Sequence, residues 1–180
     1  GNVCLTNESQ QSGTDRCAEV ARLNPGFDVV INIQGDEPLV NPMQLEQLLG
    51  AFVNPEVNIA TLGIPTSVEA DLMNLNRIKI VLDKDQNAMY FSRSAVPNSN
   101  HFQGNHLMSY PFIRHIGLYA FRTETLLEIS QLQPTALEKI ESLEQLRWLF
   151  YGYKIKVVET NIETPNIDVP EDVENVLHFL

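Results

Sequence analysis

The stretch VVINIQGDEPLV, residues 29 to 40, joins a β-branched apolar run to a short polar ending that contains Asp36 and Glu37. A short, nearly continuous apolar run is typical of a strand that is buried on both faces. Gly35 allows the backbone to turn with positive φ, and Pro38 stiffens the exit. In open α/β sheets, ligands bind outside the carboxyl ends of the strands. The stretch therefore predicts an α/β sheet with functional side chains at this strand end.

The segments around this strand alternate between helix and strand patterns. SGTDRCAEVARL has a Ser-Gly-Thr opening before helix formers, Asn41 and Pro42 open the helix NPMQLEQLLGAF, and VNIATLGIP has the composition of a further strand. VCLT, residues 3–6, also has a strand composition. This order implies right-handed crossovers and a mostly parallel, Rossmann-like sheet with helices on both faces.

The pattern changes in the second half of the chain. IKIVLD and AMYFSR flank the polar turn KDQN, which predicts an inserted antiparallel hairpin over residues 78–93. A long polar loop, residues 94–111, comes next, and its conformation cannot be predicted from its sequence. The rest of the chain predicts a strand (FIRHIGLYAF), a short helix (TETLLEIS) and one long helix (TALEKIESLEQLRWLFYG). A strand (KIKVVET) and a last helix (VPEDVENVLHFL) follow. In the long helix, an apolar stripe is expected to face the core and comprises Leu137, Ile140, Leu143, Leu146 and Leu149.

Composition excludes several classes of protein. The 180 residues suit one domain. The formal charge of −11, from 23 acidic and 12 basic residues, repels polyanions, so nucleic acid is not an expected partner. No apolar run approaches the ~18–20 residues that span a bilayer, so we expect no membrane insertion. Cys4 and Cys17 form neither a disulfide framework nor a zinc pattern, which favours a reduced, cytoplasmic location.

Two carboxylates are candidates for a metal site. Asp36 follows a strand and offers the hard oxygen ligands that Mg²⁺ takes beside phosphate, although Asp36 and Glu37 would also suit a plain turn. Asp168 also follows a strand, and it would equally suit a helix amino-terminal cap with Glu171 three residues on. Both readings stay open for each aspartate.

Polar side chains at other positions suggest a ligand pocket. Ser12, with Gly13 and Thr14, stands at a helix amino terminus, where free N–H groups suit a phosphate or carboxylate; the alternative is a capped helix with a solvated Arg16. A period of two places His115, Gly117 and Tyr119 on one face of their strand, as an open polar floor, although a lone His is more often structural.

The predicted long helix carries three further polar residues, Glu141, Glu144 and Gln145, at spacings of three and four. They lie on adjoining helix faces. Exposed Glu is ordinary on a helix, so spacing alone does not make these residues ligands.

Six motifs in order, QQSGTDR, NIQGDEP, YFSR, RHIGLYAFR, LEKIESLEQLR and IDVPEDV, resemble those of the 3-deoxy-manno-octulosonate cytidylyltransferases. The resemblance extends from about residue 7 to the carboxyl terminus. It implies an enzyme that joins CTP and 3-deoxy-D-manno-octulosonate (Kdo) into CMP-Kdo and pyrophosphate, for lipopolysaccharide biosynthesis. It further implies a nucleotidyltransferase sheet and a homodimer.

The resemblance also implies roles for individual residues. Mg²⁺ binding, and with it catalysis, falls on Asp36 and Asp168, and Ser12 and Arg16 lie near the nucleotide. Arg93 is expected to face the sugar carboxylate. The full set of residues implied to contact the sugar is Gln34, Arg93, His115, Tyr119, Glu144 and Gln145.

The resemblance implies boundaries as well. Residues 1–180 form one nucleotidyltransferase domain, in which residues 78–121 form the sugar side and a dimer region. Members of the family begin with a basic, glycine-containing loop that grips the triphosphate, and no such loop precedes GNVCLTN. We therefore expect the amino-terminal part to be missing, the intact parent to be an enzyme and these 180 residues alone to be inactive. Two alternatives remain: a CMP-sialate-type sugar cytidylyltransferase and a non-catalytic nucleotide-sugar binding module.

Overall fold

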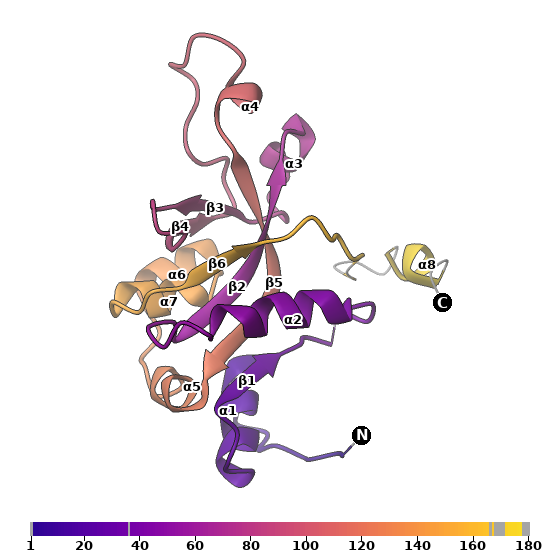
Figure 1. Ribbon diagram of the computed structural model, residues 1–180, viewed down its shortest axis with the longest axis vertical. Helices are drawn as coiled ribbons and strands as arrows, with labels where there is room; N and C mark the ends of the chain where they lie inside the picture. The colour runs from indigo at the N-terminus through magenta and orange to yellow at the C-terminus, as the bar shows by residue number, and fades with distance from the viewer. Residues whose placement is uncertain (1, 36, 166, 168–171, 178–180) are drawn as a thin grey trace.

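The computed structural model describes residues 2–35, 37–165, 167 and 172–177. Its centre is a six-stranded sheet with helices on both faces (Figure 1). The strands are β1 (Val29–Asn32), β2 (Ile59–Thr66), β3 (Lys79–Leu82), β4 (Ala88–Ser92), β5 (Phe112–Arg122) and β6 (Lys156–Glu159). The principal helices are α1 (Gly13–Leu23), α2 (Pro42–Ala51), α5 (Thr123–Ile129), α6 (Ala136–Glu141) and α7 (Gln145–Phe150). Three short helices complete the described chain: α3 (Glu69–Met73), α4 (His106–Ser109) and α8 (Asp172–Leu177).

The long strand β5 organises the sheet. It pairs antiparallel with β1, β2 and β3, while β2 pairs parallel with β6 and β3 pairs antiparallel with β4. The strand order is β4-β3-β5-β2-β6, with β1 also beside β5. The predicted α/β sheet with an inserted hairpin is confirmed, but "mostly parallel" needs correction. β1, β2, β3 and β6 run in one direction, yet because β5 runs the other way between them, β2 and β6 are the one parallel pair among the described strands.

Local sequence explains how several helices begin. Asn41 caps α2 with a capping box completed by Gln44, and Pro42 occupies the first helical position, as predicted. Ser12 caps α1 by accepting a hydrogen bond of 3.1 Å from the Asp15 N–H. These caps fix where each helix leaves the sheet, and α1 thereby begins beside the end of β1.

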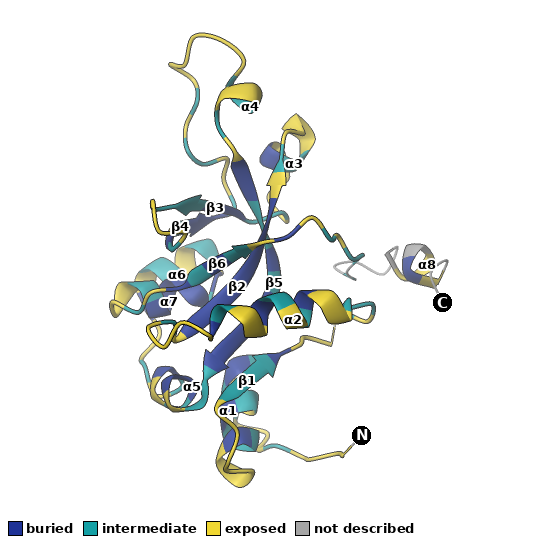
Figure 2. Cartoon of the chain, viewed as in Figure 1, coloured by how far each residue is buried: buried dark blue, intermediate teal, exposed yellow. Residues whose placement is uncertain are grey.

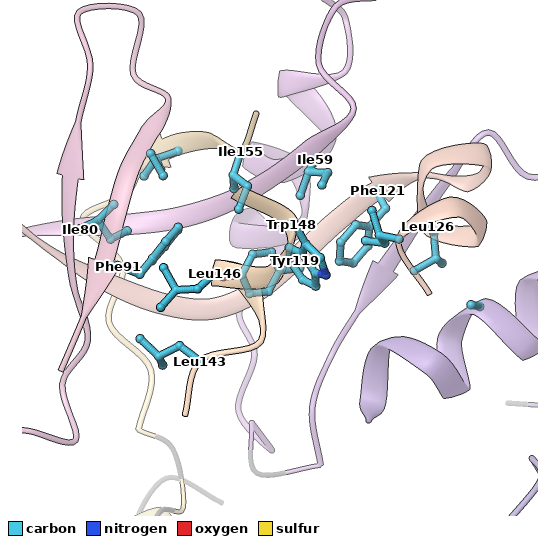
Figure 3. Close-up of a cluster of buried hydrophobic side chains, with 14 of the residues drawn as sticks. Ile59, Ile80, Phe91, Tyr119, Phe121, Leu126, Leu143, Leu146, Trp148 and Ile155 are labelled. Atoms are coloured by element: carbon cyan, nitrogen blue, oxygen red, sulfur yellow. The ribbon is translucent and has the colours of Figure 1, made fainter. Parts of the chain in front are cut away.

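Two apolar clusters lie on opposite faces of the sheet. The first joins β2, β5 and neighbouring strands to α1, α5 and α7, and Trp148 at its centre packs edge-on against Tyr119 and Phe121 (Figure 3). The second packs Leu48 of α2, and Phe52 directly after that helix, against the other face of β2 and β5. Figure 2 shows the result: the central strands are buried, whereas residues 94–111, with α4, project from one end and are largely exposed.

The predicted long helix over residues 135–152 is wrong in one respect. The chain forms α6 and α7 separately, because Ser142 adopts a left-handed conformation with φ 53° and ends α6. The break turns Ile140, which was expected in the core stripe, outward, so that its side chain is 82% exposed. The strand expected at residues 3–6 is also absent from the described chain, which has no regular structure there.

Candidate active site

The amino terminus of α1 and the start of α7 meet over the face of the sheet that carries the first apolar cluster. Thr14 Oγ1 donates a hydrogen bond of 2.7 Å to Glu144 Oε2, which joins the two helices directly. Burial raises the pKa of Glu144 above its ordinary value, and the hydroxyls of Thr14 and Ser12 offset this only in part. The other carboxylate oxygen, Oε1, is buried without a hydrogen bond, and Arg147 Nη2 lies 3.9 Å from it, too far to donate one.

The loop after β1 lies against the same helix end. A Cβ placed on Gly13 would lie 2.7 Å from Nε2 of Gln34 and 2.8 Å from its Oε1, so Gly13 makes room for that side chain. Farther along the loop, Glu37 has its Oε1 3.9 Å from the Cβ position of Gly117 on β5. The polar ending of β1 therefore reaches both α1 and β5.

The predicted floor on β5 exists, and it is more enclosed than an open pocket floor. The His115 ring packs against Phe91 and Tyr119, with centroid separations of 5.2 Å in both cases. Burial lowers the pKa of His115 to about 3, so the ring is neutral. Burial, followed by the negative charge of Glu144, raises the pKa of Tyr119. Tyr119 Oη is buried and makes no hydrogen bond of ordinary length among the described residues, while the nearby Thr61 hydroxyl offsets part of the rise in its pKa.

Thr61 of β2 lies beneath this floor. Its Oγ1 is 2.9 Å from His115 Nε2 and donates a hydrogen bond of 2.8 Å to the Leu118 carbonyl. A sequence reading does not single out Thr61, because a threonine inside an apolar strand is ordinary β-sheet composition.

Arg93 lies at the end of β4, where it is bound to the corner between α6 and α7. Its Nε donates to the Glu141 carbonyl at 2.9 Å, Nη2 to the Ser142 carbonyl at 3.3 Å and Nη1 to the Leu75 carbonyl at 3.2 Å. The Glu141 carboxylate in turn accepts bonds from the Arg93 N–H and the Ser92 hydroxyl. A guanidinium has five N–H donors, so two remain for a ligand.

Arg16 is exposed, and its guanidinium also binds the chain that precedes α1. Its Nη1 donates to Thr6 Oγ1 at 2.6 Å and to the Asn7 carbonyl at 3.4 Å. The described contacts of Arg16 are therefore structural ones that hold residues 6–10 against the helix start.

The structure brings together six residues that were predicted from sequence, around α1, α7 and β5: Ser12, Gln34, His115, Tyr119, Glu144 and Gln145. Gln145, the first residue of α7, is buried with 6% of its surface exposed. Sequence reasoning missed Thr61 and the clamping role of Glu141. It named Thr14 only as part of the helix opening with Ser12, and it missed the bond from Thr14 to Glu144.

The two proposed metal ligands, Asp36 and Asp168, lie outside the described residues. Within the ranges that the structure describes, no group of three or more His, Cys, Asp or Glu side chains is arranged to hold a metal ion. In the same ranges, no helix has both the length and the apolar character needed to cross a membrane.

Comparisons with known proteins agree with this geometry. A family model described as cytidylyltransferase matches residues 1–156. The 3-deoxy-manno-octulosonate cytidylyltransferase of Parabacteroides distasonis is 48% identical over 100% of this chain and 74% of its own length, and that of Bacteroides thetaiotaomicron is 47% identical with the same shares.

Solved structures extend the comparison. A CMP:2-keto-3-deoxy-manno-octonic acid synthetase complexed with CTP matches with a TM-score of 0.89 and 34% identity, over 99% of this chain and 72% of that one. A 4-diphosphocytidyl-2C-methyl-D-erythritol synthase from Anaerococcus prevotii, with a TM-score of 0.51 and 14% identity, shares the fold alone. The chain belongs to the cytidylyltransferase family and, within it, to the 3-deoxy-manno-octulosonate cytidylyltransferases.

Proposed function

We propose that this chain carries the sugar-binding side of an enzyme that transfers the cytidylyl group of CTP to Kdo, giving CMP-Kdo and pyrophosphate for lipopolysaccharide biosynthesis. Its relatives carry that activity in their names, and a structural relative holds CTP. One observation in the structure supports a hydroxylated ligand most directly. Tyr119 Oη and Glu144 Oε1 are buried without hydrogen bonds among the described residues, and both belong to the proposed sugar-binding set.

Buried polar atoms without partners are costly, about 1–3 kcal/mol each. A sugar acid offers several hydroxyls that can donate to a carboxylate oxygen and exchange hydrogen bonds with a phenol. Binding such a ligand would satisfy both atoms at once. Gln34 and Gln145 supply further amide donors and acceptors around them.

The reaction is an in-line attack of the Kdo anomeric hydroxyl on the α-phosphorus of CTP, with pyrophosphate as the leaving group. Positioning dominates catalysis in phosphoryl transfer. Arg93, already oriented by the carbonyls of Leu75, Glu141 and Ser142, holds the sugar carboxylate with its two remaining N–H groups. His115, Tyr119 and Glu144 bind the sugar hydroxyls. On the nucleotide side, Ser12 and Arg16 shape the start of α1.

Asp36 and Asp168 are proposed to hold Mg²⁺. The described neighbours of Asp36 support this proposal: Gln34 lies against α1, and the Glu37 carboxylate approaches β5. Carboxylate oxygens are the ligands that Mg²⁺ prefers in proteins. When bound, Mg²⁺ would neutralise phosphate charge and orient the reacting oxygens.

A homodimer in the cytoplasm completes the proposal. β4 stands at one end of the sheet order, and the region 78–121 exposes Met89, Phe102 and Met108, with exposed fractions of 62%, 50% and 80%. An exposed edge strand with apolar side chains suits pairing with a second copy. Both cysteines, Cys4 and Cys17, are free thiols, which suits a reducing compartment.

The activity test measures pyrophosphate release by the full-length protein from CTP, Kdo and Mg²⁺, with N-acetylneuraminate as the competing sugar. We expect turnover with Kdo, and loss of at least two orders of magnitude in Asp36→Ala. Exposed Glu56→Gln, in the turn after α2, is the matched control and should keep wild-type rates. Faster turnover of N-acetylneuraminate would reassign the substrate, and ligand binding without pyrophosphate release would favour a binding module.

The metal is tested without turnover. Mn²⁺ binding, followed by electron paramagnetic resonance, should weaken in both Asp36→Asn and Asp168→Asn and remain unchanged in Glu56→Gln. Undiminished Mn²⁺ binding in both aspartate variants would contradict the assignment.

A further inference from the structure

A β-bulge lies directly beneath the proposed sugar site. Thr61 pairs with Tyr119, but the next residue, Leu62, pairs with Ile116, so Gly117 and Leu118 of β5 have no partners on β2. A bulge bends its strand and frees backbone groups from the ladder. The Thr61 hydroxyl fills this gap, with its Oγ1 2.8 Å from the Leu118 carbonyl and 3.3 Å from the Ile116 carbonyl.

Counting hydrogens at Thr61 fixes the state of His115. A hydroxyl has one proton to donate, and a carbonyl oxygen can only accept. The Thr61 and Leu118 oxygens are 2.8 Å apart, and two oxygens that close repel each other unless a proton lies between them, so we place the hydroxyl proton there. Oγ1 then presents a lone pair to His115 Nε2, 2.9 Å away, and Nε2 must carry the ring proton.

The ring is neutral as well as oriented. Phe91 and Tyr119 enclose it, and burial lowers the pKa of His115 to about 3. A neutral imidazole with its proton on Nε2 has an acceptor lone pair on Nδ1. Within the described part of the chain, Nδ1 makes no hydrogen bond. His115 as a whole is partly buried and keeps some of its surface exposed.

We propose that Thr61 is a positioning residue that holds His115 as the Nε2–H tautomer, so that Nδ1 accepts a hydrogen bond from a hydroxyl of the sugar acid. This rests on the proposed function for the identity of the ligand. The assignment makes Nδ1 of His115 an obligate acceptor toward the ligand. It complements the Arg93 guanidinium, which can only donate. The site then discriminates by polarity: a hydroxyl at that position of the sugar binds, and an ether or deoxy analogue leaves Nδ1 unpaired.

The tautomer is measured first, by long-range ¹H–¹⁵N correlation of the histidine ring in the wild-type protein. We expect a protonated Nε2 and an unprotonated, pyridine-like Nδ1 at neutral pH. Thr61→Val removes the hydroxyl at nearly constant volume and should shift His115 toward a mixture of tautomers, whereas Thr61→Ser should restore the wild-type spectrum. A protonated Nδ1 in the wild type overturns the inference without any variant, so the test survives if Thr61→Val fails to fold.

Steady-state kinetics give the functional readout. Loss of one oriented hydrogen bond of about 1.4 kcal/mol is about tenfold in affinity. We therefore expect Thr61→Val to raise KM for Kdo about tenfold, with kcat and KM for CTP little changed and with rescue in Thr61→Ser. Equal losses for both substrates would indicate a merely structural role. Absence of any turnover by the wild type would overturn the proposed function while leaving the tautomer result intact.

Discussion

Thr14 and Glu144 are 130 positions apart in the chain, yet Thr14 Oγ1 donates a hydrogen bond of 2.7 Å to Glu144 Oε2. Thr14 belongs to the helix opening on the nucleotide side, and Glu144 begins the segment assigned to the sugar. This bond joins the two halves of the candidate site. Because burial raises the pKa of the Glu144 carboxylate, we expect the site to respond to pH and to substitutions around Glu144.

Removing the hydroxyl at position 14 tests this tie. Thr14→Val should raise KM for Kdo several-fold, because the Glu144 carboxylate loses the bond that orients it. It should also move the acid limb of kcat/KM to higher pH, since that bond lowers the pKa of Glu144. Thr14→Ser keeps a hydroxyl and should behave like the wild type. An unchanged pH profile in Thr14→Val, measured from pH 5 to 9, would separate Glu144 from substrate binding.

Glu144 should cost stability at neutral pH. Its pKa is raised in the folded protein, so the folded state binds more protons than the unfolded state between the two pKa values, and its contribution worsens as pH rises. Glu144→Gln should therefore raise Tm at pH 7 while reducing turnover. The gain should vanish below the unfolded value of 4.5, where both states are protonated. Thermal unfolding of the two proteins from pH 4 to 8 gives the comparison, and a gain that grows in acid would contradict the assignment.

Two glycines provide a matched pair. In Gly13→Ala the new Cβ meets only the end of the Gln34 side chain, at 2.7 Å, which can move aside. We expect near-normal stability and a raised KM for Kdo. In Gly63→Ala the Cβ meets Ile113 Cγ2 at 2.5 Å and Val157 Cγ1 at 2.9 Å in the packed core, which should cost about 1–3 kcal/mol of unfolding free energy. Urea unfolding and Kdo kinetics on both variants separate the two effects, and a normal KM in Gly13→Ala would remove Gln34 from the site.

Glu141 should act through Arg93. Its carboxylate accepts from the Arg93 N–H at 3.0 Å and the Ser92 hydroxyl at 2.8 Å, so Glu141→Ala releases the end of β4. We expect KM for Kdo to rise at least tenfold while KM for CTP stays constant. The neighbouring Ile140→Ala, at a side chain that is 82% exposed, is the control. Equal changes in both KM values would mean that Glu141 supports the fold as a whole.

The ion pair between Arg147 and Glu138 should contribute mainly to stability. Arg147 donates through both Nε, at 2.9 Å, and Nη2, and the two side chains are only 11% and 13% exposed. Glu138→Gln removes the carboxylate that binds the nearly buried guanidinium and leaves only Glu144, 3.9 Å away, so it should cost up to about 3–5 kcal/mol of unfolding free energy. Lys84→Gln, which removes the exposed pair with Asp85, should cost under about 1 kcal/mol.

The pH dependence of this pair has the opposite sign to that of Glu144. Burial raises the pKa of Glu138, but the bonds from Arg147 and the Thr135 N–H outweigh it, so the folded value is lowered. The stabilisation is therefore present above the unfolded value of 4.5 and is lost as pH falls through the folded value. The difference in unfolding free energy between wild type and Glu138→Gln should shrink in acid, as urea unfolding from pH 3 to 7 would show.

Sequence alone determined the elements whose signals are local. The cap at Asn41, the turn before β4 and the apolar runs of β2 and β5 are fixed by side-chain period and by backbone preferences within a few residues, and each was predicted. The family motifs supplied the proposed site residues, and a period of two predicted that His115 and Tyr119 share one face. The structure bears out that shared face, since the two rings pack together.

Tertiary structure decided the rest, because it depends on contacts between residues far apart in the chain. Continuous helical periodicity over residues 135–152 concealed the break at Ser142, which places Glu141 at the corner that binds Arg93. The direction of β5 within the sheet follows from its pairing with β1, β2 and β3, whose paired residues all lie more than thirty positions earlier, and its local sequence does not encode that pairing. The tautomer of His115 depends on a hydroxyl from a neighbouring strand, and only the folded sheet brings Thr61 within 2.9 Å of the ring.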